Sequence, residues 1–179
     1  MKKAIIIAGN FVQDQEFIYP YYRLLEENFV IDVCINENKF VKGFLGTDIP
    51  PNKDQKLVEI EDIKPENYNF LVLPGGVKSM EKVRQNKRIL NFITEFDKQK
   101  KVIACICSGT QLLISAKVVQ GRKISGYYSM IDDIINSGAT YEDKPAVADK
   151  NIITTAHYKD MGPWMAKALE VFYKNNPKP

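Results

Sequence analysis

Three short runs of almost wholly apolar residues, each ended by a turn, constrain the fold of this chain most. The runs cover residues 3–8, 70–73 and 102–106, and the turns that follow them are Gly-Asn, Pro-Gly-Gly and Cys-Ser-Gly. A strand that is apolar on both faces is typical of a parallel sheet that helices cover on both sides. The three runs therefore predict an α/β protein with a parallel central sheet.

Strand and helix patterns alternate along the rest of the chain. The segment 88–98 predicts an amphipathic helix with four apolar residues on one side: Ile89, Leu90, Ile93 and Phe96. Further strands are expected at 30–35, 123–127 and 151–155, further helices at 14–28, 110–117, 130–136 and 162–174, a hairpin or edge excursion at 39–49, and a short strand at 57–60. Alternating strands and helices predict a mostly parallel sheet with helices on both faces.

The composition is that of one globular domain. The 179 residues are 45% hydrophobic with a net charge of +3, and the Lys and Arg residues are scattered among acidic ones. We therefore expect a single domain over 1–179 and no nucleic-acid partner. The first apolar run is too short for a signal peptide, and no segment is long enough to span a bilayer. These features predict a cytoplasmic protein with no membrane partner.

Cys107 is the main candidate for chemistry. It lies between the strand 102–106 and the helix 110–117, so the chain must turn sharply there and expose its side chain at the carboxyl edge of the sheet. Backbone N–H groups and the positive end of the helix dipole favour a thiolate at such a turn. A reactive nucleophile and an inert small residue in a tight turn both fit this position. Cys105, two residues earlier, is expected to be a buried strand residue, and both thiols are expected to be reduced.

Three other positions fall where side chains could reach Cys107. The turn at Gly75 and Gly76 could form an oxyanion hole, or it could be a plain turn. Glu16 could hydrogen-bond the thiol or carry its proton, or it could be a solvated helix residue. His157, the only histidine, follows the last strand and is the only candidate for a histidine base, although it could also be a surface residue.

The sequence gives no indication of a cofactor or a metal ion. One histidine and three cysteines lack the spacing of a zinc site. The first strand is followed by Gly-Asn-Phe instead of a dinucleotide-binding glycine pattern, and there is no P-loop. We therefore expect neither.

Four segments, in this order, resemble the ThiJ/PfpI superfamily. They are Glu-Phe-Ile-Tyr-Pro-Tyr-Tyr-Arg-Leu-Leu-Glu-Glu within 10–27, Phe-Leu-Val-Leu-Pro-Gly-Gly at 70–76, Ala-Cys-Ile-Cys-Ser-Gly at 104–109, and Gly-Arg-Lys-Ile-Ser with Asp-Asp-Ile-Ile-Asn-Ser-Gly within 121–138. The resemblance covers nearly the whole chain. It implies a flavodoxin-like three-layer α/β/α sandwich with a nucleophile elbow, and a homodimer or higher homo-oligomer. It also accounts for Pro20 inside the first helix.

The same resemblance implies roles for individual residues. Cys107 is similar to the elbow nucleophile or oxidation-sensing thiol, and Glu16 to the acidic residue that contacts it. Gly76 and Ser108 are similar to the backbone donors of the oxyanion hole.

This chain also departs from the superfamily pattern near the pocket. Ser108 stands where peptidase-like members have a histidine, which makes proteolysis less favoured. Tyr127 or Tyr128 stands where redox-sensing relatives have a histidine. The loop after the last strand is Ala-His-Tyr-Lys instead of an Arg-Gly-Pro-like sequence. This loop is expected to border the pocket, with Gly75, Tyr127 and Tyr158 lining it, so His157 could supply the missing base.

The resemblance favours a cysteine-dependent hydrolase or lyase that acts on small reactive carbonyl compounds, in the manner of a glyoxalase or deglycase. Two alternatives stay open. One is a non-enzymatic oxidative-stress sensor or chaperone-like protein in which Cys107 oxidises to a sulfinic acid. The other is an amidase, peptidase or isonitrile hydratase.

Overall fold

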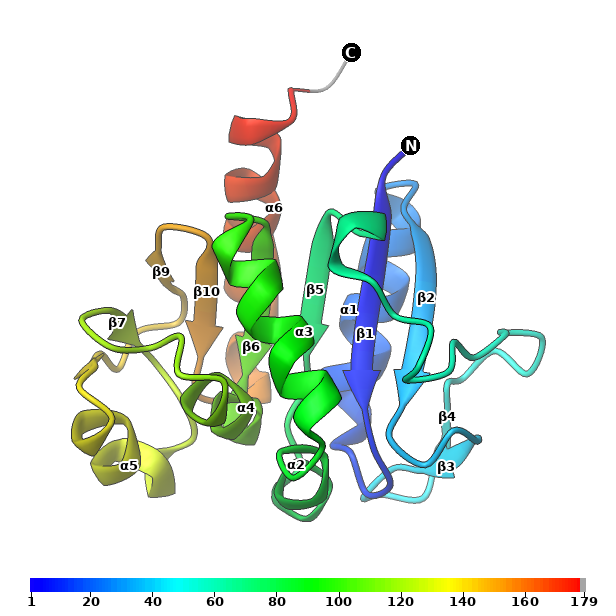
Figure 1. The fold of residues 1–179 in the computed structure, drawn as a ribbon, viewed down its shortest axis with the longest axis horizontal. Helices are drawn as coiled ribbons and strands as arrows, with labels where there is room; N and C mark the ends of the chain where they lie inside the picture. Colours follow the sequence, from blue (N-terminus) through cyan, green and yellow to red (C-terminus); the bar gives the residue numbers. More distant parts are fainter. Residues whose placement is uncertain (178–179) are drawn as a thin grey trace.

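A six-stranded sheet forms the middle layer of the protein in the computed structural model, which describes residues 1–177 (Figure 1). The strand order is β2-β1-β5-β6-β10-β9. The strands are β1 (Lys3–Ala8), β2 (Val30–Ile35), β5 (Phe70–Leu73), β6 (Val102–Ile106), β9 (Val147–Asp149) and β10 (Ile152–Thr155). All neighbours pair in parallel except β9 and β10, so the sheet is mostly parallel, as the apolar runs predict.

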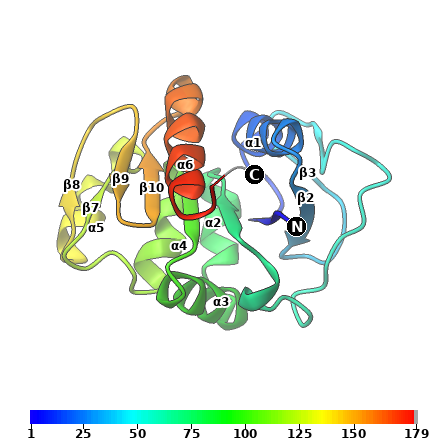
Figure 2. The same ribbon diagram turned by 90° about the horizontal axis from the view of Figure 1, so that it is seen from above.

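Helices cover both faces of the sheet, which Figure 2 shows from above. One face carries α1 (Asp14–Glu26) and α6 (Met161–Asn175), and the other carries α2 (Val77–Val83), α3 (Lys87–Lys98) and α4 (Thr110–Ser115). A further short helix, α5 (Ile131–Asn136), lies beyond the end of the sheet that β9 forms. This arrangement confirms the expected flavodoxin-like three-layer α/β/α sandwich.

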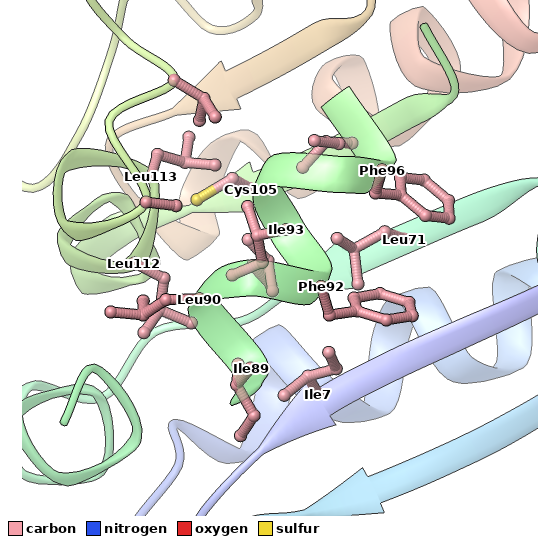
Figure 3. Packing of buried hydrophobic residues seen from close by; sticks show 14 of the residues in the cluster. Ile7, Leu71, Ile89, Leu90, Phe92, Ile93, Phe96, Cys105, Leu112 and Leu113 are labelled. Carbon is pink, nitrogen blue, oxygen red and sulfur yellow. The ribbon is translucent and has the colours of Figure 1, made fainter. Parts of the chain in front are cut away.

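Each face of the sheet has its own hydrophobic core. On the α3 side, all four predicted apolar residues of that helix are buried and pack toward Leu71 and Cys105 of the sheet (Figure 3). On the other side, residues of α1 and α6, among them Phe17 and Trp164, pack on the sheet. Burying one such large side chain stabilises the fold by about 1.5–3 kcal/mol. The two cores hold the carboxyl ends of the strands at one edge.

Two strand predictions are corrected by the structure. In the segment 57–60 only Leu57 forms a bridge, to Val33. The strand expected at 123–127 is limited to β7 (Lys123–Ile124), which pairs with β8 (Thr140–Tyr141) outside the main sheet. The chain leaves a strand path there because the Ser125 amide donates to the side-chain oxygen of Thr154 instead of to a neighbouring backbone.

Other elements agree with the expectation or add to it. The excursion at 39–49 is a hairpin of β3 (Val41–Lys42) and β4 (Asp48–Ile49). The helix α2 and the antiparallel strand β9 have no counterpart among the predicted elements. Within residues 1–177, none of the helices has both the length and the apolar character needed to cross a bilayer.

A buried polar cluster joins α3 to the strand edge opposite the predicted site. Both carboxylate oxygens of Asp97 accept hydrogen bonds from Arg122, at 2.8 and 2.9 Å. Asn151, at the start of β10, donates to Asp97 at 3.0 Å and accepts from Arg122 at 3.2 Å. Because each charge is paired inside the protein, loss of one partner leaves the other charge buried and uncompensated.

We expect the substitution Asp97→Ala to lower the free energy of unfolding by about 3–5 kcal/mol, since it leaves the Arg122 guanidinium unpaired. Urea denaturation measures this change. The matched control is Lys98→Ala, because Lys98 pairs with Glu95 on the surface, where the loss should be below about 1 kcal/mol. Equal losses for the two variants would contradict a structural role for the Asp97 cluster.

Candidate active site

Cys107 occupies a strained turn between β6 and α4. Its φ angle is +57°, in the left-handed region that side chains other than glycine rarely adopt. A 3-10 turn, Cys107–Gly109, then leads directly into α4. The sharp turn predicted from the sequence is therefore present. The side chain is only 9% exposed, however, instead of projecting freely from the sheet edge, because Gly75 and Glu16 pack against it.

The carboxyl group of Glu16 is wholly buried beside this cysteine. Its Oε2 atom accepts a hydrogen bond from the Gly75 amide at 2.8 Å, and the carboxyl also hydrogen-bonds the Cys107 thiol. The other oxygen, Oε1, is buried and has no hydrogen-bond partner among the described residues. Glu16 is thus not a solvated helix residue, and the structure brings it together with Cys107.

The start of α1 fixes the position of Glu16. The side chain of Gln13 caps the helix by accepting from the Glu16 amide at 3.0 Å. Asp14 is buried and accepts the amides of Leu45 and Thr47, at 2.7 and 3.0 Å, from the β3–β4 hairpin. These bonds satisfy donors that would otherwise be unpaired, and they hold the first turn of the helix over the end of the sheet.

The loop after β5 closes the other side of the thiol. At Gly75 an added Cβ would overlap Glu16 Oε2 and would lie 2.8 Å from Cys107 Cβ, so any side chain there would fill the site. Gly76 has a φ angle of +98°, which favours glycine. The amide of Gly75 donates to Glu16, and a role of the Gly76 and Ser108 amides as oxyanion donors stays a prediction.

The protons of Glu16 and Cys107 are coupled by burial and proximity. Burial raises the pKa of Glu16 to about 7, although the hydrogen bonds from Cys107 and Gly75 oppose this shift. Burial and the nearby Glu16 charge raise the pKa of the Cys107 thiol to about 12, while hydrogen bonds from Ser108 oppose the increase. These shifts run opposite to the thiolate that the helix N-terminus favours, because a charged sulfur would lie buried beside the Glu16 carboxyl.

A family model agrees with the fold and the elbow. The model of the DJ-1/PfpI family matches residues 2–171, nearly the whole chain. The chain belongs to the DJ-1/PfpI family. It is 32% identical to the deglycase PfpI of Pyrococcus furiosus over 94% of this chain and 98% of that protein. It is 33% identical to protein/nucleic acid deglycase 2 of Escherichia coli, over 89% of this chain and 90% of the relative.

A solved structure shows the same fold. In a two-domain protein of Anabaena variabilis with DJ-1/ThiJ/PfpI-like and ferritin-like domains, the matching region superposes with a TM-score of 0.87 at 29% identity. The match covers 95% of this chain and 48% of that one.

In this DJ-1/PfpI protein, His157 lies among tyrosines. Its Nδ1 atom accepts the Lys159 amide at 3.2 Å, and its ring centroid is 4.0 Å from that of Tyr158 and 6.4 Å from that of Tyr127. Among residues 1–177 no hydrogen bond joins His157 to Cys107. The link is indirect, because the Tyr127 amide donates to the Cys107 carbonyl at 3.3 Å. A histidine base at Cys107 thus stays a prediction without a direct contact.

The roles of three residues at this DJ-1/PfpI site were not expected from the sequence. Gln13 and Asp14 were not identified as the residues that anchor Glu16, although both stand at the first turn of a helix, where polar side chains commonly cap. The clustering of Tyr128 with the other rings was not predicted either. Within the described part of the chain, no group of three or more His, Cys, Asp or Glu side chains is placed to hold a metal ion.

The substitution Glu16→Gln should change how stability depends on pH. The Glu16 pKa is near 7 in the fold and near 4.5 when exposed, so between these values the folded state binds more protons than the unfolded state. The parent therefore loses stability as pH rises through this window, by about 3 kcal/mol, and the Gln variant does not.

Urea denaturation from pH 4 to pH 8, below the titration of the thiol, measures this difference. Glu26→Gln on the same helix is the control, because that side chain is 69% exposed. The difference in the free energy of unfolding between this variant and the parent should hardly change with pH. If the difference between Glu16→Gln and the parent is also independent of pH, burial does not raise the pKa of the Glu16 carboxyl.

The substitution Gly75→Ala should disrupt the pair by inserting a methyl group between Glu16 and Cys107. Overpacking of this kind costs about 1–3 kcal/mol. Gly162→Ala is the control, since an added Cβ there meets nothing within 4 Å. Thermal unfolding compares the two variants, and an unchanged Gly75→Ala protein would contradict the close approach at the elbow.

Proposed function

We propose that this protein is a cysteine-dependent hydrolase or lyase of glyoxalase or deglycase type, acting on small reactive carbonyl compounds. The observation that carries the proposal is the buried contact between Glu16 and Cys107 at a strained elbow. A carboxyl with a pKa near 7 can both accept and return a proton at neutral pH. Two relatives named as deglycases, one archaeal and one bacterial, support the same chemistry.

The geometry supports a stepwise proton transfer. As the sulfur of Cys107 bonds to an aldehyde carbon, the thiol proton passes to the ionised Glu16 carboxylate, so no free thiolate is needed beforehand. The carbonyl oxygen becomes negative, and the amides of Gly76 and Ser108 are the proposed donors to it. Return of the proton from Glu16 to this oxygen gives a neutral hemithioacetal.

A 2-oxoaldehyde substrate allows the reaction to continue without a cofactor. The former aldehyde carbon of the hemithioacetal loses its proton to Glu16, and the resulting enediolate receives that proton on the adjacent carbon. The hydroxyl proton of the first carbon moves to the oxygen of the second, which leaves a thioester of a 2-hydroxy acid on Cys107. Water then cleaves the thioester and releases the acid and the thiol. For methylglyoxal the product is lactate. An adduct of an amine with the 2-oxoaldehyde can react by the same steps. The sulfur of Cys107 displaces the amine, which takes up the thiol proton as it leaves, and the hemithioacetal results.

The peptidase alternative has less support. A peptidase of this type needs a histidine that exchanges a proton with the nucleophile. Ser108 follows the cysteine, and His157 makes no hydrogen bond to it among the described residues.

Lactate release from methylglyoxal tests the proposed function. Cys107→Ser should abolish turnover, and Glu16→Gln should lower kcat at least 100-fold, within the range expected for loss of an acid–base group, roughly 10²–10⁴. The control is Cys34→Ala, a buried cysteine in the core on the α3 side of the sheet, which should retain activity. Intact mass after mild peroxide is measured in parallel. Oxidation of Cys107 without turnover in the parent would favour a redox sensor and overturn the enzyme proposal.

A further inference from the structure

Three tyrosine rings gather around His157 at the edge of the sheet that carries Cys107. We call this group the aromatic platform: Tyr127, Tyr128, His157 and Tyr158. Two residues come from the turn that leads to α5 and two from the turn that leads to α6. The His157 ring is inclined by only 24° and 23° to the rings of Tyr127 and Tyr128, with centroids 6.4 Å apart in both pairs.

Two backbone connections hold the platform next to the nucleophile. The Tyr127 amide donates to the Cys107 carbonyl at 3.3 Å. In the parallel pairing of β10 with β6, Thr155 lies beside Ile106. Neighbouring strands are about 4.8 Å apart. The segment from Thr155 to His157 therefore begins beside the segment from Ile106 to Cys107. The backbone of the platform residues Tyr127 and His157 therefore lies next to the turn at Cys107.

The platform is not part of either hydrophobic core. Tyr127, Tyr128 and Tyr158 are 38%, 39% and 43% exposed. The His157 ring is fixed because its Nδ1 accepts the Lys159 amide. Partly exposed aromatic faces in a fixed arrangement offer a surface on which a flat conjugated group can stack, and an alkyl group gains less from the same faces.

Charged side chains of both signs lie at the rim of the platform. Lys159 interacts with Tyr128, and Asp160 and Asp143 are the acidic groups near that lysine. Opposite charges this close offset each other, so the aromatic faces, and not a net charge, distinguish the ligands of the platform.

We propose that the aromatic platform binds the flat conjugated part of the substrate, so that the protein prefers aryl 2-oxoaldehydes and related adducts over alkyl ones. The carbonyl chemistry in this inference rests on the proposed function of Cys107. The platform itself is a binding surface and can be tested separately.

The kinetic test compares phenylglyoxal with methylglyoxal, using initial rates taken before phenylglyoxal modifies arginines. The measured quantity is the ratio of the two kcat/KM values, because this ratio cancels effects on Cys107 itself. In Tyr158→Ala the ratio should fall roughly tenfold relative to the parent, because kcat/KM falls more for phenylglyoxal than for methylglyoxal. Tyr158→Phe, which keeps the ring, should retain the parent ratio. The control Tyr22→Ala removes an exposed tyrosine of α1 and should also retain it.

A binding test separates the platform from the chemistry. Mandelate and lactate are the acids that phenylglyoxal and methylglyoxal would yield, and their Kd values are measured by NMR titration. Mandelate should bind the parent roughly tenfold more tightly, and this advantage should disappear in Tyr158→Ala and persist in Tyr158→Phe.

The two tests distinguish the possible failures. Absence of turnover with both oxoaldehydes would overturn the proposed function, while selective mandelate binding would still support the platform. If mandelate binds the parent no more tightly than lactate, or if Tyr158→Ala lowers kcat/KM equally for both oxoaldehydes, the platform inference is overturned.

Discussion

The hydrogen bond from the Gly75 amide to the buried Glu16 carboxyl is the interaction on which the candidate site depends. It joins the loop after β5 to the first turn of α1, directly over the thiol of Cys107. Burial alone would exclude a charged carboxyl from this position, and the amide and the thiol compensate part of that penalty. The result is a carboxyl whose pKa is raised to about 7 by burial, next to a thiol whose pKa is raised as well.

The rest of the fold maintains this contact. The strained backbone at Cys107 persists because β6 is buried between two cores and α4 continues directly from the turn. Glycine at position 75 leaves the space that Glu16 occupies. At the opposite edge, the cluster of Asp97, Arg122 and Asn151 ties α3 to the start of β10. Rigid elements thus present a site made of loops and helix ends.

Membership of the DJ-1/PfpI family explains the elbow but leaves the substrate open, because one fold can serve different reactions. The aromatic platform is where this chain offers information of its own. Its rings come from two turns that are distant in sequence, and one of these turns donates a backbone hydrogen bond to Cys107. Under the two proposals, a substrate that fits both the Glu16–Cys107 pair and these rings would carry a reactive carbonyl and a flat conjugated group.

The sequence by itself determined the parallel sheet, the two helical layers and the elbow at Cys107, because apolar runs, amphipathic patterns and turn residues act locally. It did not determine that β7 leaves the main sheet, since a side chain of distant β10 takes the Ser125 amide. It also predicted a thiolate, because a helix N-terminus is visible in a sequence and burial is not. The family resemblance already implied that Glu16 contacts Cys107. Only the tertiary structure showed how deeply that pair is buried and placed His157 among tyrosines, since burial and ring contacts depend on neighbours that the chain brings together by folding.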